Sequence, residues 1–555
     1  GSTIRGRVNL LSLIERSGIH IAHLSGRFGM DSSAIYLQNF DLQTPESAIQ
    51  VDLQAGATAL QMDPASPISL TLHAQITPNE ILPWFAINSP SLRHTFAGKT
   101  IVFNDQTSGT LGELISETGL NIPYHCHFTV TSRLRSITNI EALSGHIDLK
   151  GVLSNADFLT RLFQSDGTTP QRLVIPKHIG LRGAIDLHQG TYAPRIAVAV
   201  DSGTLRLNGR LNSKSEQYKL SLIAQDFPIK DFLPQDSLGR LTLNLHAQGK
   251  GFDPFAVKTT TDFGLDIDRF DYRGFTYHGL GIKLSLQNQL LNGLLDSHNE
   301  ALQLALQLNG KLTKTHQTLS VQGKIDSCYL DRMHLVKEPI GGTLCLNLSA
   351  SADADSTYAA MLQVDSITLW NGWEKNSIRP LNLSFTTSPI HTRVGLKSGD
   401  LTLNFDSPTG VDSLGKRFSR GAASMATMLR SENFYMDSIS QQLPSFLLRA
   451  QAGDQNILNN FLKLKGIEFK NLDLDASLQD SLPFKVNMVI NQLDAGKIQL
   501  DILTFSLRQK QQRLNYLLRV ANHPGNLDSL GMIALYGHIE GNEAILNCLQ
   551  EGRTG

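Results

Sequence analysis

His125, Cys126 and His127 form the one cluster in this sequence whose residue types could bind a transition metal. Imidazole nitrogens and thiolates are the usual zinc ligands, and a structural zinc site takes four of them. On a β-strand, the two histidines would point to one face and the cysteine to the other. One strand cannot then gather three ligands, and no second cluster is evident. We therefore interpret this segment as a polar strand face and predict no metal and no cofactor.

Other residues with catalytic potential do not form recognisable patterns. The sequence has no Gly-rich phosphate loop, no G-x-S-x-G elbow and no H-E-x-x-H motif. Its three tryptophans do not suggest the aromatic ladder of a sugar-binding β-solenoid, so an enzyme or sugar-binding solenoid is the least favoured interpretation. The four cysteines are too scattered to predict a disulfide framework; they are Cys126, Cys328, Cys345 and Cys548. We expect a protein that is not an enzyme.

The composition excludes several classes of protein. The chain has 555 residues, a formal net charge of -1, 41% hydrophobic residues and 84 leucines. A near-zero net charge argues against binding to nucleic acid, which requires a basic surface. The hydrophobic content is too high for a disordered chain, and no apolar run approaches the roughly 18–20 residues of a membrane helix. Because the sequence starts with Gly1-Ser2-Thr3, we expect a signal or anchor segment to precede it in the full-length protein.

The dominant pattern is alternation of apolar and polar residues. Leucine occupies every second position in segments 241–245, 302–308 and 344–348. Such alternation gives each strand one apolar and one polar face, as in antiparallel sheets with one side in water. We interpret dipeptides such as Asn208-Gly209 as turn signals between the strands, and we find no long helical crossovers in most of the sequence. The sequence therefore predicts a mainly β, largely antiparallel sheet with short helical turns.

The strand pattern repeats along the chain at a spacing of about one hundred residues. Leu220-Ser221-Leu222 recurs as Leu319-Ser320-Val321, and Asn208-Gly209-Arg210-Leu211 recurs as Asn309-Gly310-Lys311-Leu312. Repeats that stack only on their neighbours build elongated structures rather than globular domains. We expect four segments, namely N-terminal β-repeats in 1–135, repeats of about one hundred residues in 136–410, a helical insert in 411–465 and further β-repeats in 466–555.

The helical insert is the one region where the alternation stops. From about Val411 to Lys463, the apolar residues are spaced for two amphipathic helices separated by Pro444. These helices could form a lid over the apolar face of the sheet or a structural cap, and the sequence does not choose between them. The candidate lid residues are Phe418, Met425, Leu429, Phe446 and Phe461.

The apolar face of the predicted sheet is mostly leucine. If the sheet curves lengthwise into a half-pipe, this face becomes a long hydrophobic groove whose dimensions suit acyl chains. The alternative is an ordinary closed core between two packed sheets. The candidate groove-lining residues are Leu205, Leu207, Leu211, Leu241, Leu243, Leu245, Leu302, Leu304, Leu306, Leu308, Leu344, Leu346, Leu348, Leu401 and Leu403.

Several segments resemble the TamB family, the translocation and assembly module subunits within the AsmA-like superfamily of bridge-like lipid transfer proteins. The resemblance lies in the alternating strands, in N-G-[RK]-L endings and in segments 40–47, 226–234 and 241–254. It is strongest over about residues 130–410. Asp-Ser followed by leucine or isoleucine resembles the O-glycosylation pattern of periplasmic proteins in Bacteroidota, although Asp-Ser is also common in turns. These pairs start at Asp236, Asp365, Asp412, Asp437, Asp480 and Asp528.

The resemblance implies a periplasmic, monomeric β-taco protein, anchored in the inner membrane of a Gram-negative bacterium and reaching its outer membrane. Its implied role is to carry phospholipids along a hydrophobic groove. The alternative role is assembly or secretion of outer-membrane proteins with a BamA- or TamA-type barrel partner, through pairing at the edge of the sheet. The C-terminal domain that is typical of the family is not recognisable here, and the family's repeats do not predict the helical insert.

Overall fold

The structure is a computed structural model. It describes residues 3–14, 20–82, 87, 89–155, 157–163, 173–463, 465–479, 482–496, 498–522 and 531–551. The Asp-Ser pairs that start at Asp480 and Asp528 therefore lie outside the described residues.

The described part of the chain is mainly β, as the alternation predicts, with 64% of its residues in strands and 11% in helices. Its 33 strands form an open antiparallel sheet that does not close into a barrel. The chain divides into two compact units. Unit 1 contains residues 1–254 and 258–287, and unit 2 contains residues 255–257 and 288–555. Of the described residues, none belongs to a helix that is long and apolar enough to span a membrane.

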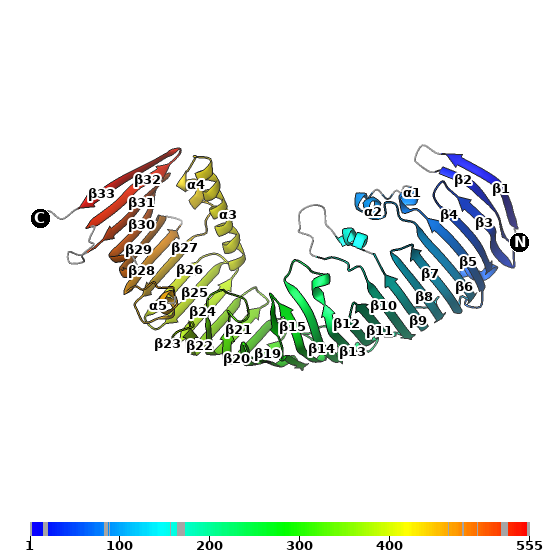
Figure 1. Ribbon diagram of the computed structural model, residues 1–555, viewed down its shortest axis with the longest axis horizontal. Coiled ribbons are helices and arrows are strands. Elements are labelled where there is room, and N and C mark those ends of the chain that lie inside the picture. Colours follow the sequence, from blue (N-terminus) through cyan, green and yellow to red (C-terminus); the bar gives the residue numbers. More distant parts are fainter. Residues whose placement is uncertain are drawn as a thin grey trace. The chain divides into compact units, whose positions relative to one another are not determined.

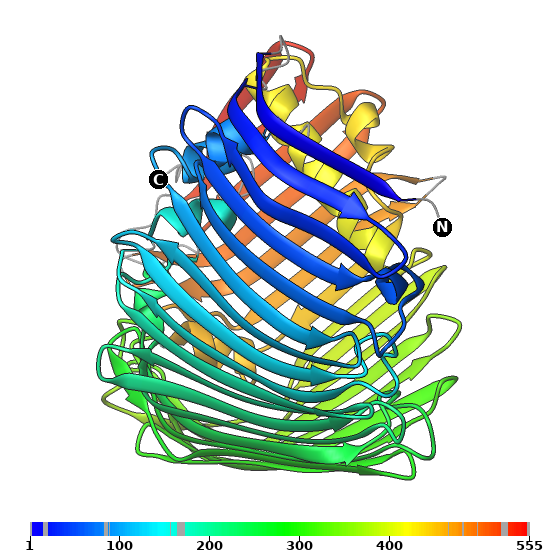
Figure 2. The same cartoon turned by 90° about the vertical axis from the view of Figure 1, so that its right-hand side faces the viewer.

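Unit 1 is built from strands that pair with their neighbours in the sequence (Figures 1 and 2). Its strands are β1 (Ile4–Ile14), β2 (His20–Met30), β3 (Ala34–Gln43), β4 (Ala48–Gly56), β5 (Pro67–Ile76), β6 (Ile101–Thr110), β7 (Glu113–Ile122), β8 (Cys126–Arg135), β9 (Ser144–Leu153), β10 (Ile179–His188), β11 (Thr191–Val200), β12 (Gly203–Asn212), β13 (Gln217–Pro228), β14 (Leu238–Lys250), β15 (Thr260–Tyr272), β16 (Phe275–Tyr277) and β17 (Leu280–Gln287). Its short helices are η1 (Ala57–Gln61), α1 (Pro78–Ile81), α2 (Pro90–Thr95), η3 (Asp157–Phe163) and η4 (Ile229–Asp231).

Unit 2 has the same neighbour-to-neighbour pairing within it and carries α3, the longest helix of the described residues. Its strands are β18 (Leu290–Asn299), β19 (Leu302–Leu312), β20 (His316–Tyr329), β21 (Gly341–Asp353), β22 (Tyr358–Trp370), β23 (Lys375–Ile378), β24 (Leu381–Ser388), β25 (His391–Ser398), β26 (Leu401–Ser407), β27 (Phe446–Ala452), β28 (Asn471–Gln479), β29 (Leu482–Asp494), β30 (Gln499–Lys510), β31 (Arg513–Ala521), β32 (Met532–Glu540) and β33 (Glu543–Glu551). Its helices are α3 (Val411–Arg430), α4 (Met436–Ser440) and α5 (Ile457–Lys463).

The predicted repeat appears as two matching series of strands, β12–β17 and β19–β24. In each series the third and fourth strands, β14 and β15 or β21 and β22, have 13 residues. In each series the fourth strand also pairs with both of the strands that follow it: β15 pairs with β16 and β17, and β22 pairs with β23 and β24. The repeat of about one hundred residues is therefore a repeat of strand order and pairing as well as of sequence.

The two helices predicted for the insert are present as α3 and α5. The insert is nevertheless only partly helical, because it also contains a strand that the sequence did not predict. Residues 446–452 form β27, which pairs with β26 and β28 inside the sheet. Its apolar residues, from Phe446 to Ala452, alternate as in the other strands. Leu447 interrupts this alternation in the sequence, and Pro444 lies close before it. A strand of only seven residues beside two helices was therefore not recognised.

Candidate functional site

One row of apolar side chains crosses unit 2 without a charged residue. Opposed residues on paired strands have side chains on the same face, so the register defines such rows. Fourteen strands at about 4.8 Å spacing extend this central row over roughly 60 Å along the sheet. Its members, each opposed to the next, are Leu308, Val321, Leu348, Leu362, Leu383, Leu396, Leu403, Ala450, Leu474, Met488, Phe505, Leu518, Leu535 and Cys548.

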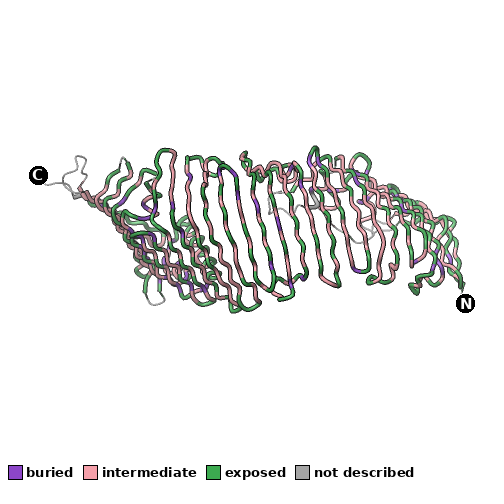
Figure 3. The backbone as a smooth tube through the Cα atoms, turned by 90° about the horizontal axis from the view of Figure 1, so that it is seen from below, coloured by how far each residue is buried: buried purple, intermediate pink, exposed green. Residues whose placement is uncertain are grey.

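All fifteen leucines predicted to line a groove lie on the apolar face of their unit. Leu401 is buried and Leu211 is exposed, while the other thirteen are half-buried. A closed core would bury leucines almost completely. The alternating pink and green along the strands in Figure 3 shows the same result, with few fully buried positions. Over most of its area, therefore, this face is covered only by the side chains of neighbouring strands.

Sequence reasoning named only three of the fourteen members of the central row, Leu308, Leu348 and Leu403. It missed Val321, Leu362, Leu383 and Leu396, and it missed every member from Ala450 to Cys548. Their segments alternate less clearly, because residues such as Leu447 and Val489 are apolar on the opposite face. The available signal was the resumed alternation after Leu472, from which Leu474 and Met488 could have been assigned.

Helical segments cover the apolar face of unit 2 at both ends of its strands (Figure 1). At one end, Met436 and Ile439 of α4 are fully buried and pack with Leu514 of β31. At the other end, Ile457 and Leu458 of α5 pack on a cluster that includes Leu401 and Ala452. The part of the central row from Leu403 to Met488 runs between these two covered margins.

The five candidate lid residues have different environments. Phe418 and Met425 lie on the packed side of α3, and the ring centroids of Phe418 and Phe446 are 5.5 Å apart. Phe446 belongs to β27, so it cannot be part of a helical lid. Leu429 and Phe461 point outward, with 50% and 49% of their surface exposed. The residues that do pack fix the insert at the margin of the sheet.

The polar face carries cross-strand ion pairs. The His146 ring contacts the carboxylates of Asp186 and Asp148 at 2.6 and 2.8 Å, and Arg195 contacts Asp186 at 2.8 Å. The hydrogen bond to Asp186 raises the pKa of His146, and Asp148 adds to this effect against the opposing desolvation. The same hydrogen bond lowers the pKa of Asp186. These groups are well exposed, so the cluster contributes little to stability.

The raised pKa predicts a pH-dependent contribution from His146. The pKa of His146 is higher in the folded state than the unfolded value of about 6.5, so its protonation stabilises the folded protein at pH values below 6.5. This contribution disappears as the pH rises through the folded-state pKa. His146→Gln should therefore reduce the resistance of unit 1 to urea more at pH 5 than at pH 8. The matched control is His127→Gln on β8, whose ring contacts the Thr129 hydroxyl. An equal loss at both pH values would contradict the prediction.

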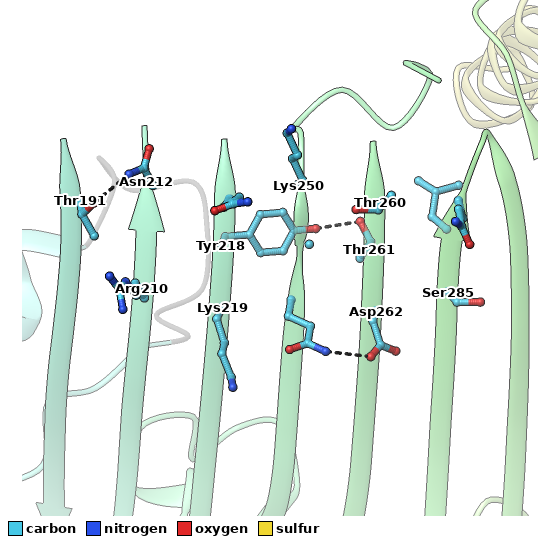
Figure 4. Close-up of a pocket in the computed structure, with 15 residues that line it drawn as sticks. Thr191, Arg210, Asn212, Tyr218, Lys219, Lys250, Thr260, Thr261, Asp262 and Ser285 are labelled. Carbon is cyan, nitrogen blue, oxygen red and sulfur yellow. Dashed lines mark hydrogen bonds between the residues drawn. The ribbon is translucent and has the colours of Figure 1, made fainter. Parts of the chain in front are cut away.

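One hollow of unit 1 lies mainly on the polar face of the sheet. It has a volume of about 860 Å³ in unit 1 and is lined mainly by polar-face residues such as Arg210, Lys219 and Asp262 (Figure 4). The Tyr218 ring crosses β14, where Gly249 leaves room for it, and its hydroxyl lies 2.7 Å from the Thr261 hydroxyl. None of the fifteen predicted leucines lines this hollow. Three of its four charged lining residues are cationic, namely Arg210, Lys219 and Lys250, and the hollow is open, so it offers no enclosed apolar site.

The His-Cys-His segment does not form a metal centre. His125 precedes β8, its Nδ1 lies 2.6 Å from the Asn155 carbonyl oxygen, and its ring packs against Phe158. Cys126 is buried and His127 is exposed; burial raises the pKa of the Cys126 thiol. Within the described residues, no three His, Cys, Asp or Glu side chains are placed to hold a metal ion. The four cysteines are free thiols.

Comparisons with protein-family models, with curated proteins and with solved structures found no match for this chain. The resemblance to the TamB family thus stays a prediction from sequence.

Proposed function

We propose that this protein is a periplasmic lipid transfer protein that carries phospholipid acyl chains along its apolar face between the inner and outer membranes. The observation that carries the proposal is the uncharged central row of unit 2. Thirteen of its fourteen members, from Leu308 to Leu535, are aliphatic, aromatic or methionine side chains. An acyl chain needs such a surface, because it can make no hydrogen bonds.

The partial exposure of this row supports the proposal energetically. Half-buried leucines leave apolar area in water, and soluble proteins rarely expose large contiguous apolar patches without a use for them. An acyl chain placed on the row removes water from both surfaces, at roughly 0.8 kcal/mol per buried methylene. Because the contact is non-directional, a chain can move along the row without breaking specific bonds.

The covered margins of unit 2 also fit this proposal. The buried clusters around Ile439 and Leu401 close the apolar face at the two strand ends. The central row between them is thus left as the accessible apolar strip. In this arrangement the insert acts as a structural margin, and acyl chains lie beside it.

Lipid crosslinking tests the proposal directly. A photo-reactive residue at Leu474, in the central row, should crosslink to phospholipid when the protein is purified from cells, and mass spectrometry should identify the lipid. The same group at Asp473, which is exposed on the opposite face, is the matched control. Equal or absent crosslinking at the two positions would contradict the proposal. Crosslinks from an edge strand to an outer-membrane barrel protein, in place of lipid, would favour an assembly role.

A further inference from the structure

A group of polar residues interrupts the apolar face of unit 1. In this unit the row equivalent to the central row runs from Leu72 of β5 to Asp105, Thr118 and Val130 on the next three strands. The adjacent row contains Thr107, Ser116 and Ser132, each opposed to the next. We name this group the polar island; its members are Asp105, Thr107, Ser116, Thr118 and Ser132.

Hydrogen bonds within the polar island hold the Asp105 carboxylate at the floor of the face. The Thr118 hydroxyl donates to one carboxylate oxygen at 2.5 Å, and the Thr107 hydroxyl donates to the other at 2.8 Å. The Ser116 and Thr118 hydroxyls lie 3.3 Å apart. Asp105 is only 8% exposed, although it lies on a face whose leucines are mostly half-buried. The polar island is thus a hydrogen-bonded network, and Asp105 is not an isolated polar side chain that points into water.

Apolar rows continue on both sides of the polar island. On one side, Phe103, Leu120 and Phe128 are opposed to one another in turn. On the other side, Leu114 is opposed to Leu134. Leu120 and Leu114 are six residues apart on β7, so the two apolar rows are separated by roughly 20 Å.

The row through Leu120 is narrow because its outer neighbours are already covered. Ile122 and Cys126, at the strand ends next to this row, are 5% and 6% exposed. The free apolar width beside the polar island is therefore about one side chain. In unit 2, the corresponding strip carries no charged residue that would divide it.

We propose that the polar island divides the lipid-binding face of unit 1 into two separate lanes, so that acyl chains pass beside Asp105 and not over it. This inference rests on the proposed lipid transfer function and adds to it the path that the acyl chains take across unit 1. An acyl chain laid over Asp105 would remove the water that can still reach the carboxylate and would offer no hydrogen bond in return. An acyl chain that lies on Leu120 displaces water from no polar group, so it costs no hydrogen bond. Asp105 is thus a positioning residue for the cargo.

Photo-crosslinking at three positions tests this path. A photo-reactive phenylalanine analogue at Leu120 should crosslink to phospholipid several-fold more than the same analogue at Ser116. Comparable yields at both positions would overturn the inference. The same analogue at Leu348 in unit 2 reports on the proposed function itself: lipid at Leu348 with equal yields in unit 1 refutes only the lanes, whereas no lipid at any position refutes the function.

A variant without the carboxylate provides the second test. Asp105→Leu combined with Thr118→Val removes the carboxylate together with its cross-strand donor. The Thr107 hydroxyl loses its acceptor, but it is only half-buried and can bond to water. This variant should raise crosslinking at Ser116 several-fold, to the level at Leu120. The matched control is Gln106→Leu, which adds a leucine to the same strand on the opposite face. No gain in the double variant, or an equal gain in the control, would overturn the inference.

Discussion

Leu348→Glu should reduce phospholipid transfer by more than tenfold while the protein remains folded. Leu348 lies in the central row, between Val321 and Leu362 on the neighbouring strands. Without lipid, the introduced carboxylate can stay in water because the position is only half-buried. With an acyl chain above it, the carboxylate loses that water at a cost of several kcal/mol, and each 1.4 kcal/mol corresponds to about a factor of ten.

The matched control for this charge is Asn347→Glu. Asn347 is the preceding residue on β21 and is exposed on the polar face. The two variants have the same strand, the same introduced side chain and nearly the same place along the sheet. Transfer of fluorescent phospholipid between vesicles should be lost in Leu348→Glu and retained in Asn347→Glu.

Two results would contradict this prediction in different ways. Normal transfer by a folded Leu348→Glu variant would show that acyl chains do not use the central row. Unfolding of the variant, measured by circular dichroism, would show instead that this face is a closed core. The experiment therefore separates the lipid path from the alternative of two packed sheets.

Ile439→Ala should destabilise the helical margin of unit 2 by about 2–5 kcal/mol, the range typical of a large-to-small change in a packed core. Ile439 is fully buried with Phe434, Met436 and Leu514. Its truncation removes apolar contacts and leaves a cavity between α4 and β31. We expect faster amide hydrogen exchange in α4 and the end of α3, and an earlier urea transition in unit 2.

The control for this truncation is Leu429→Ala. Leu429 lies on α3, but half of its surface is exposed, so the change should stay within about 0.5 kcal/mol. Similar exchange rates in the two variants would contradict the view that the insert is fixed by its buried side. A variant that deletes the whole insert would be less informative, because it would also remove β27 from the sheet.

The sequence by itself determined the local geometry of this protein. Alternation in segments such as 241–245 and 344–348 identifies strands and assigns each leucine to one face, because successive side chains on a strand point in opposite directions. The repeat of about one hundred residues followed from matches such as Leu220 with Leu319, and the structure confirmed it as a repeat of strand pairing. Alternation depends only on residues close together in the chain, and the repeat follows from comparing such local patterns along the sequence.

Only the tertiary structure decided which residues lie next to one another across strands. Register depends on turn lengths and on bulges, such as the one between Ala224 and Phe227, and a shift of one residue moves a side chain to the other face. The sequence gives no sign that Asp105, Thr118 and Thr107 share hydrogen bonds. Nor does it show that β27 completes the sheet between two helices. Contacts of this kind join distant segments, and so the uncharged row of unit 2 and the polar island of unit 1 appear only in the folded chain.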